Sequence, residues 1–373
     1  MRITGPAKLD RRTKNLVRRL QPGDIAVICH EDLDQVAAAD LVAKKVAAVI
    51  NTRESISGTY PNLGPETLLA ANIPLIDNTG DAIMALPEGT PISVAADGAI
   101  YHNHTLVARG TIITPKIAQH KIAAARANMG LALDRFIDNT LTYAKKEKSF
   151  ITGPLELPPL KTKLQGRQVL VVARGNNFRQ DLAAIRDYVD DVKPVLIGVD
   201  GGADLLVEFG YRPDIVIGDM DSVSDRTLNY SRELVVHAYP DGRVPGLERV
   251  QRLGLAAQVF SCPGTSEDIA LLLAYENQAD LIVAVGCHSN MIDFLEKGRP
   301  GMASTFLVRL KVGPILVDAK GVSKLYQRSL NLHYVAALLA AAMVPMIAVI
   351  ATSPPMQYIL KLLELRLRLA FGF

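Results

Sequence analysis

Residues 199–223 read VDGGADLLVEFGYRPDIVIGDMDSV, and this stretch decides the fold of the second half of the chain. One apolar run ends at Val199 and another spans 215–217. Each stops at a cluster of glycine and aspartate, and a helical segment separates them. A strand, a helix and a second strand in this order form the repeating unit of a parallel sheet covered by helices. The stretch therefore predicts an α/β domain with acidic residues at its strand ends.

The same alternation extends over residues 167–320, which we expect to form one domain. Its apolar runs lack regular polar positions, as is typical of strands buried on both faces of a parallel sheet. The runs are RQVLVVARG, KPVLIGVDGG, PDIVIGDMDS, ELVVHAYP, AAQVF, LIVAVGC and PILVDAK. Ligands bind such sheets beyond the carboxyl ends of the strands, so the polar residues there are the candidate site.

The turn after residues 215–217 is the strongest candidate for a metal site. Asp219 and Asp221 could share one Mg²⁺, which prefers oxygen ligands and usually keeps substrate phosphates in its coordination shell. Gly218 would let the backbone pass closely, and Ser222 could hydrogen-bond a phosphate. An Asx turn beginning DSVSD explains the same residues without any ligand.

Glycines also follow the preceding apolar run. Gly201 and Gly202 come directly after Asp200, where bare backbone at the start of a helix favours an anion. A tight turn that simply needs glycine is the alternative interpretation. The end of the run at 167–175 adds further candidates for binding nucleotide phosphates. These are Arg174, Gly175 and Asn176.

A third candidate is the helix start GTSEDIALLLA, residues 264–274. Thr265 or Ser266 would cap this helix, and acidic residues occupy its first turn. Thr265 is also a candidate for binding phosphate. The sequence leaves two roles open for Asp268, either as part of this cap or as a third ligand of the metal.

The N-terminal part is expected to form a separate domain. Residues 1–22 are basic with few apolar positions and are expected to be a flexible arm. Residues 23–114 begin with the strand GDIAVICH and end with a hairpin that turns at Asp97-Gly98. Their order of elements resembles the swivelling β/β/α domain of phosphoenolpyruvate-utilising enzymes. The loop at 53–69 lacks the histidine that carries the phosphoryl group there, so we expect a binding or docking module.

A long helix and a linker are expected between the two domains. Apolar residues recur at spacings of three and four over residues 115–152, which predicts a connecting helix and a seam for a homodimer. Residues 153–166 are rich in proline, and we interpret them as a linker.

The C-terminal region is strongly apolar. Residues 333–353 are long enough to cross about 30 Å of hydrocarbon as one helix, and a buried, alanine-rich core or dimer helix is the alternative. Residues 356–373 mix leucine with arginine and predict an amphipathic tail that lies on a membrane surface or packs on a partner protein. The N-terminus lacks the apolar segment of a signal peptide, so the large N-terminal part is expected to stay cytosolic.

Charge and cysteine content exclude some classes of protein. The net charge is only +3 over 373 residues, so no global attraction to nucleic acid is expected. The three cysteines are far apart and lack CxxC spacing, which predicts neither a disulfide framework nor a zinc site.

Residues 199–223 are similar to the catalytic domain of thiamin pyrophosphokinases and of the related pterin pyrophosphokinases. This resemblance implies an ATP–Mg²⁺ site in which Asp219, Asp221 and Asp268 hold the metal. The segment that should carry the substrate motif reads GCHSNMIDFL, where Asp293 remains while the arginine and histidine of the motif are missing. A nucleotide site is therefore expected, and a thiamin site is not.

An active enzyme of this kind would need a base for its acceptor alcohol. His237 and His288 are candidates only because they lie at strand ends. Ordinary hydrogen-bonded histidines are the alternative interpretation.

The order of all these segments resembles SteA-type cytokinetic ring proteins. The shared features are the basic start, the opening GDIAVICHEDLDQVAAADLVA, the loop INTRESISGTYPNLGP, the turn GDMDSVSD and the apolar C-terminal segment. The resemblance implies a location on the cytoplasmic face of the plasma membrane at the division septum, and a membrane protein partner of the SteB type.

Three hypotheses about function stay open at this point. In the first, the chain is a membrane-associated septal scaffold or regulator whose pyrophosphokinase-like domain binds a nucleotide or a diphosphate. In the second, it is an active Mg-ATP-dependent diphosphokinase that transfers pyrophosphate to a small thiamin-like or pterin-like alcohol. In the third, it is a plain cytosolic dimer whose C-terminal helix is buried.

Overall fold

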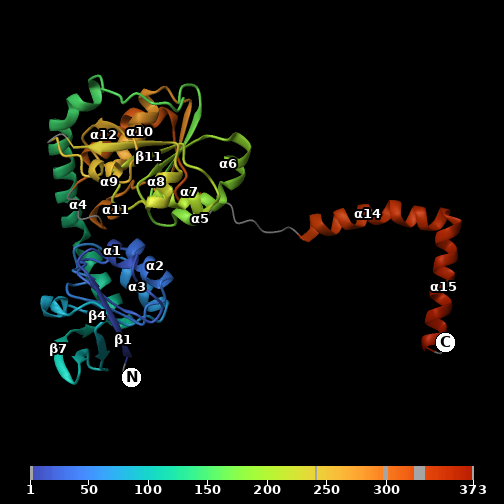
Figure 1. Ribbon diagram of the computed structural model, residues 1–373, viewed down its shortest axis with the longest axis horizontal. Coiled ribbons are helices and arrows are strands. Elements are labelled where there is room, and N and C mark those ends of the chain that lie inside the picture. The colour runs from blue at the N-terminus through green and yellow to red at the C-terminus, as the bar shows by residue number, and fades with distance from the viewer. Residues whose placement is uncertain (1–2, 240–241, 297–300, 323–331, 372–373) are drawn as a thin grey trace. The chain divides into compact units, whose positions relative to one another are not determined.

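The chain divides into two compact units, Met1–Ser323 and Lys324–Phe373, and each is described by itself. The computed structural model describes residues 3–239, 242–296, 301–322 and 332–371. The first unit contains two α/β domains and the long helix α4 (Figure 1).

One eight-stranded sheet forms the first domain. Its order is β7-β6-β5-β1-β2-β3-β4-β8, with parallel pairs from β1 to β4 and antiparallel pairs toward both edges. The strands are β1 (Ile3–Asp10), β2 (Ile25–Ile28), β3 (Ala48–Asn51), β4 (Leu75–Asp77), β5 (Pro91–Val94), β6 (Ala99–His102), β7 (Thr105–Arg109) and β8 (Thr111–Ile112). The hairpin predicted to turn at Asp97-Gly98 is confirmed, since β5 and β6 are antiparallel.

The described part of residues 1–22 is not the flexible arm that its composition predicts. Strand β1 lies in the middle of the sheet, parallel to β2 and antiparallel to β5. Helix α1 (Thr13–Val17) follows it, and Leu16 and Leu20 are buried in the core. The prediction is wrong because backbone pairing orders a strand whatever the charge of its exposed side chains, and two leucines suffice to fix the segment behind it.

Helices and hairpins cover opposite faces of this sheet. On one face, Ala26 and Ile28 of β2 pack with α1, α2 (Gln35–Ala43), α3 (Gly64–Ala70) and the start of α4. On the other face, Ile25 and Val27 pack with residues of β5 and β6. Strand β2 is apolar throughout because both of its faces are buried. A short 3₁₀ helix, η1 (Asp81–Ala85), precedes β5. Membership of the swivelling class stays a prediction.

Helix α4 (Pro115–Thr152) confirms the predicted connecting helix. It contacts α3 in the first domain and α12 in the second. The linker predicted at 153–166 carries no helix or strand and runs along the second domain. The backbone amides of Lys161 and Thr162 donate to the Glu233 carboxylate at 2.9 and 3.0 Å, which attaches the linker to the start of β12.

The second domain contains a wholly parallel seven-stranded sheet, which confirms the predicted α/β class. Its order is β13-β12-β11-β10-β9-β14-β15. The strands are β9 (Gln168–Val172), β10 (Val195–Val199), β11 (Ile215–Gly218), β12 (Glu233–Ala238), β13 (Gln258–Ser261), β14 (Leu281–Val285) and β15 (Leu316–Asp318). The helices are α5 (Phe178–Ala184), α6 (Arg186–Val192), α7 (Gly202–Glu208), α8 (Asp225–Tyr230), α9 (Leu247–Arg252), α10 (Ser266–Glu276), α11 (Met291–Glu296), α12 (Ala303–Val312) and the 3₁₀ helix η2 (Gly313–Ile315).

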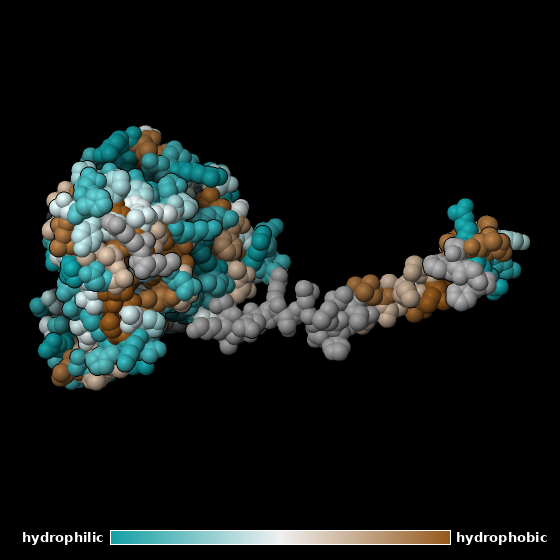
Figure 2. Space-filling model, turned by 90° about the horizontal axis from the view of Figure 1, so that it is seen from below, coloured by the Kyte–Doolittle hydropathy of each residue, from teal (hydrophilic) through white to brown (hydrophobic). Residues whose placement is uncertain are grey.

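Two helices form the described part of the second unit, α14 (Leu332–Thr352) and α15 (Pro354–Phe371). Figure 2 shows hydrophobic residues along α14 and a mixture of hydrophobic and hydrophilic residues on α15. Among the described residues, no helix on its own has the length and apolar content to cross a membrane. Ala337–Ile350 and Pro354–Leu369 meet that criterion only as a pair bent by 96°. The single transmembrane helix predicted over 333–353 is therefore not confirmed, while the predicted tail is the helix α15.

Candidate functional site

The carboxyl ends of the central strands of the second domain meet at one edge of the sheet. Arg174, Asp200 and Asp219 follow β9, β10 and β11, which are neighbours in the sheet. Parallel strands place such residues side by side. The acidic turn that the sequence singles out therefore lies next to the Asp-Gly-Gly turn.

Gly218 allows these two turns to pack closely. Its φ of +144° is a conformation that favours glycine, and a Cβ at this position would lie 2.1 Å from Asp200 Oδ1. The Asp200 carboxylate fills the space and accepts a hydrogen bond from the Met220 amide at 3.0 Å. The Gly201 amide in turn donates to the Ser222 hydroxyl at 3.1 Å. Each turn thus holds the other in place.

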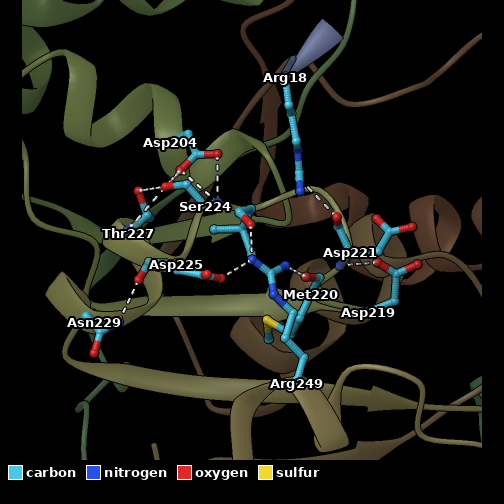
Figure 3. Close-up of polar contacts among 11 residues, drawn as sticks. Arg18, Asp204, Asp219, Met220, Asp221, Ser224, Asp225, Thr227, Asn229 and Arg249 are labelled. Atoms are coloured by element: carbon cyan, nitrogen blue, oxygen red, sulfur yellow. Dashed lines mark hydrogen bonds and ion pairs between the residues drawn. The ribbon is translucent and has the colours of Figure 1, made fainter. Parts of the chain in front are cut away.

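The acidic turn itself is fixed from below by an arginine that the sequence did not suggest. Arg249 of α9 donates to the carbonyl oxygens of Met220 and Val223 and forms an ion pair with Asp225 (Figure 3). The Asp219 carboxylate accepts from the Asp221 amide at 3.1 Å. This is an Asx-type bond, and it begins two positions before the Asx turn at Asp221 that the sequence suggested.

Negative charge is concentrated at these strand ends. Burial and the neighbouring Asp219 carboxylate raise the pKa of Asp200 to about 7. Burial also raises the pKa of Asp219, with a contribution from the charge of Asp221. Burial works in the same direction on Asp221, but the hydrogen bond and charge of Lys14 hold the pKa of Asp221 below its ordinary value. The turn therefore favours a cation among its carboxylates.

A cleft of about 720 Å³ opens over these residues and is bounded by both domains. Its first-domain wall carries side chains of both charges, and its second-domain wall carries hydroxyl, carboxylate and guanidinium groups. The first wall contains Arg11, Arg12, Lys14 and His30 together with the carboxylates of Glu31, Asp34 and Asp40. The second wall includes Arg174, Asp200, Gly201, Asp219, Ser222, Thr265, Ser266, Glu267 and His288. The sequence missed the first wall because it assigned residues 1–22 to a flexible arm.

Three contacts hold the first domain against the site. The Lys14 ammonium forms an ion pair with the Asp221 carboxylate. Arg18 donates to the Asp221 carbonyl oxygen at 3.0 Å, as Figure 3 shows. Arg174, which the sequence offered as a nucleotide-binding residue, forms an ion pair with Asp40 of α2. The Asp40 carboxylate of the first domain therefore partly neutralises the Arg174 guanidinium of the second.

Asp268 does not join the acidic turn. Its carboxylate accepts from the Thr265 amide at 2.9 Å, while the Thr265 hydroxyl accepts from the Asp268 amide at 3.1 Å, which completes a capping box on α10. The hydroxyls of Ser304 and Thr305 donate to the same carboxylate oxygen. These bonds match the capping role, which is one of the two roles that the sequence left open for Asp268. The predicted group of three metal ligands, Asp219, Asp221 and Asp268, is not formed.

Other predicted phosphate-binding residues are not part of the cleft wall as far as the chain is described. They are Gly175, Asn176 and Gly202. A Cβ on Gly202 would lie 2.1 Å from the Val172 carbonyl oxygen, so this glycine is needed for the close approach of α7 to β9. The alternative interpretation of a turn that needs glycine therefore explains Gly202.

The two candidate histidines differ. His237 is fully buried, and its Nε2 donates to the Cys262 carbonyl oxygen at 2.8 Å, so it is an ordinary hydrogen-bonded histidine. His288 lines the cleft, and its Nδ1 lies 2.7 Å from Glu267 Oε1. The other Glu267 oxygen accepts from the His288 amide at 2.7 Å, which fixes the orientation of the ring. Asp293 lies outside this pair and bonds to Lys320.

The residues present fit a magnesium ion that is shared with phosphates. In the part of the chain that the structure describes, no three or more His, Cys, Asp or Glu side chains are arranged to hold a metal alone. Mg²⁺ commonly takes only one or two carboxylates and completes its shell with phosphate oxygens and water. The adjacent carboxylates of Asp219 and Asp221 match that smaller requirement (Figure 3).

Comparison with known families assigns two parts of the chain. Residues 187–243 match the thiamin pyrophosphokinase catalytic domain, and residues 320–371 match the SteA-like C-terminal domain. No curated protein matches the chain.

Two solved structures are similar to parts of the chain. A thiamine pyrophosphokinase from Bacillus subtilis is 24% identical, over 35% of this chain and 52% of that one, with a TM-score of 0.23. The chain thus spans about half the length of that protein. A 3-isopropylmalate dehydratase from Methanocaldococcus jannaschii is 10% identical, over 36% of this chain and 99% of that one, with a TM-score of 0.22.

The matched turn at 199–223 lies inside the first of these family matches, and the helices α14 and α15 lie inside the second. One chain therefore carries a match to the thiamin pyrophosphokinase catalytic domain and a match to the SteA-like C-terminal domain, the combination that its resemblance to SteA-type proteins predicts.

Proposed function

We propose that this protein is a membrane-associated scaffold or regulator of cell division whose second domain binds a nucleotide or diphosphate together with Mg²⁺. The SteA-like C-terminal domain supports a role at the division septum, on the cytoplasmic face of the plasma membrane. A membrane partner of the SteB type and a homodimer belong to the same proposal. The pyrophosphokinase match supports the ligand class.

One observation carries the ligand proposal: the cleft combines a cation-seeking turn with guanidinium groups. Asp219, which lines the cleft, and the adjacent Asp221 provide the first, and Arg11 and Arg12 provide the second. A metal-bound diphosphate has complementary charge toward both walls, because its metal faces carboxylates while its oxygens accept from guanidinium groups. Neutral ligands would use neither.

The other cleft residues suit the same ligand. Ser222, Thr265 and Ser266 present hydroxyl groups that can donate to phosphate oxygens. The metal, when bound, would offset the negative charge of the phosphates. The frame of Arg249 and Gly218 holds the backbone of the acidic turn in place, so the turn itself needs little reorganisation on binding.

Calorimetry on the full chain tests the proposal. We expect Mg²⁺ with ATP, ADP or pyrophosphate to bind, and Asp219→Asn to weaken binding at least about tenfold, since one charge-assisted contact to the ion contributes about 1.5–3 kcal/mol. Asp280→Asn, an exposed aspartate of the same domain, is the matched control. If none of the three ligands, ATP, ADP or pyrophosphate, showed magnesium-dependent binding, the proposal would be refuted.

A second candidate function is an active diphosphokinase, and the pair of His288 and Glu267 favours it. A histidine oriented by a carboxylate at a cleft wall is the arrangement of a general base. The assay measures AMP release from ATP with thiamin-like and pterin-like alcohols. Turnover that His288→Gln abolishes would establish the enzyme, whereas binding without AMP release leaves the scaffold.

The membrane part of the proposal has its own test. Cells that produce the full chain or a chain without residues 333–373 are fractionated, and we expect only the full chain in the membrane pellet. Equal distribution of the two proteins would exclude a tether in this region.

A further inference from the structure

A lysine of the first domain occupies the acidic turn of the second. Lys14 on α1 and Asp221 after β11 are 207 positions apart in sequence, yet the Lys14 ammonium forms an ion pair with Asp221 Oδ2. Arg18, one turn later, binds only the carbonyl oxygen of Asp221, at 3.0 Å. Of the two cations, Lys14 alone takes up a carboxylate oxygen.

This oxygen is one that a divalent cation would need. The turn offers the carboxylates of Asp219 and Asp221 to a metal, and the Lys14 ammonium is already paired with one of them. An ammonium and a divalent cation repel each other strongly at contact distance, so both cannot share one carboxylate at no cost. Entry of the metal must therefore displace Lys14.

We propose that Lys14 is an intramolecular competitor of the divalent cation at Asp221, so that metal binding and the docking of α1 on the second domain oppose each other. This inference rests on the proposed magnesium-dependent site. The opposition is reciprocal, as for any two linked binding events, so the metal weakens the docking by the same factor as the docking weakens the metal.

The contact that competition would break is one of three between the domains at the site. Asp40 with Arg174 and Arg18 with the Asp221 carbonyl oxygen do not involve a carboxylate oxygen of the turn. Displacement of Lys14 therefore loosens the first domain without releasing it fully.

The test compares Mg²⁺ affinity, measured by calorimetry with Mg²⁺ alone and with Mg²⁺ and ADP, for the full-length wild type, Lys14→Gln and Lys8→Gln. Lys8 carries the same charge in the same domain but pairs with Glu88, so it controls for a change in net charge. We expect Lys14→Gln to bind the metal about threefold to fivefold more tightly than the wild type does. This factor corresponds to the free energy of one half-exposed ion pair, which the metal no longer has to break. Lys8→Gln should match the wild type.

A second measurement uses the unaltered protein. Acetylation of lysines is followed by peptide mass spectrometry with and without Mg²⁺ and ADP. The metal should increase modification of Lys14 relative to Lys8, since a free amine reacts and a paired ammonium does not.

The outcomes separate this inference from the proposed function. If the wild type and Lys14→Gln bind Mg²⁺ with ADP equally well, or if the ratio of Lys14 to Lys8 modification is unchanged, the competition is refuted and the binding function stands. If none of the proteins binds, both are refuted.

Discussion

Substitution of Gly218 by alanine tests whether the two turns of the site depend on each other. The added Cβ would lie 2.1 Å from Asp200 Oδ1, and the backbone φ of +144° disfavours any side chain. To make room, the Asp200 carboxylate must turn away and lose its hydrogen bond from the Met220 amide. Backbone strain of this kind costs about 1–3 kcal/mol, and a bond to a charged acceptor contributes about 1.5–3 kcal/mol. We expect Gly218→Ala to lower the free energy of unfolding by about 2.5–6 kcal/mol.

A double-mutant cycle separates the two contributions. The three atoms nearest to the added Cβ all belong to Asp200. In an Asp200→Ala background the Gly218→Ala substitution should therefore cost only the strain, about 1–3 kcal/mol. Urea unfolding followed by circular dichroism measures all four proteins. Gly130→Ala in α4, where no atom lies within 4 Å of the added Cβ, is the control and should be neutral or slightly stabilising. Equal costs of Gly218→Ala in both backgrounds would refute the interlocking of the turns.

Three further predictions follow from single groups. Thr265→Ala should lower the free energy of unfolding by about 1 kcal/mol in urea melts, because the N-cap of α10 is lost; an unchanged midpoint would contradict the capping role. Burial raises the pKa of Cys262 to about 12, so Cys29 should react with a thiol reagent at pH 8 well before Cys262, and the reverse order would contradict the assigned burial. In EDTA, the stability contributed by protonated Asp200 should decline as the pH rises from 3.8 toward about 7, because folded Asp200 holds its proton longer than the unfolded chain does; the difference in stability between wild type and Asp200→Asn should change over this range, and that between wild type and Asp280→Asn should not.

Local patterns were sufficient to predict the second domain. Its strands are short, continuous apolar runs such as VLIGV and LIVAV, and every one of them lies in the parallel sheet. Burial on both faces removes polar positions from such strands, so the class of sheet is visible in each run. The rule that places ligands at carboxyl strand ends then located Asp200 and Asp219 beside one another.

Only one of the two walls of the candidate site was predicted from the sequence. Its second-domain wall was found, since the residues follow strands in sequence. Its first-domain wall was missed, because Arg11, Arg12 and Lys14 lie in a basic segment with no periodic pattern of its own. Arg249 was missed for the same reason, as nothing in its short helix indicates that its guanidinium reaches the carbonyl oxygens of the acidic turn.

The amino-acid sequence by itself determined the parallel sheet, the long helix α4 and the chemistry at the strand ends, because strand burial, helical periodicity and turn residues are properties of neighbouring positions. Only the tertiary structure decided that residues 3–10 are a central strand, that the Asp268 carboxylate accepts a hydrogen bond from Thr305, and that Lys14 faces Asp221. Each of these depends on a partner far away in the chain: β5 for the strand, α12 for Asp268 and the turn after β11 for the lysine. A contact between distant segments leaves no periodic trace in either, so it is fixed only when both are packed.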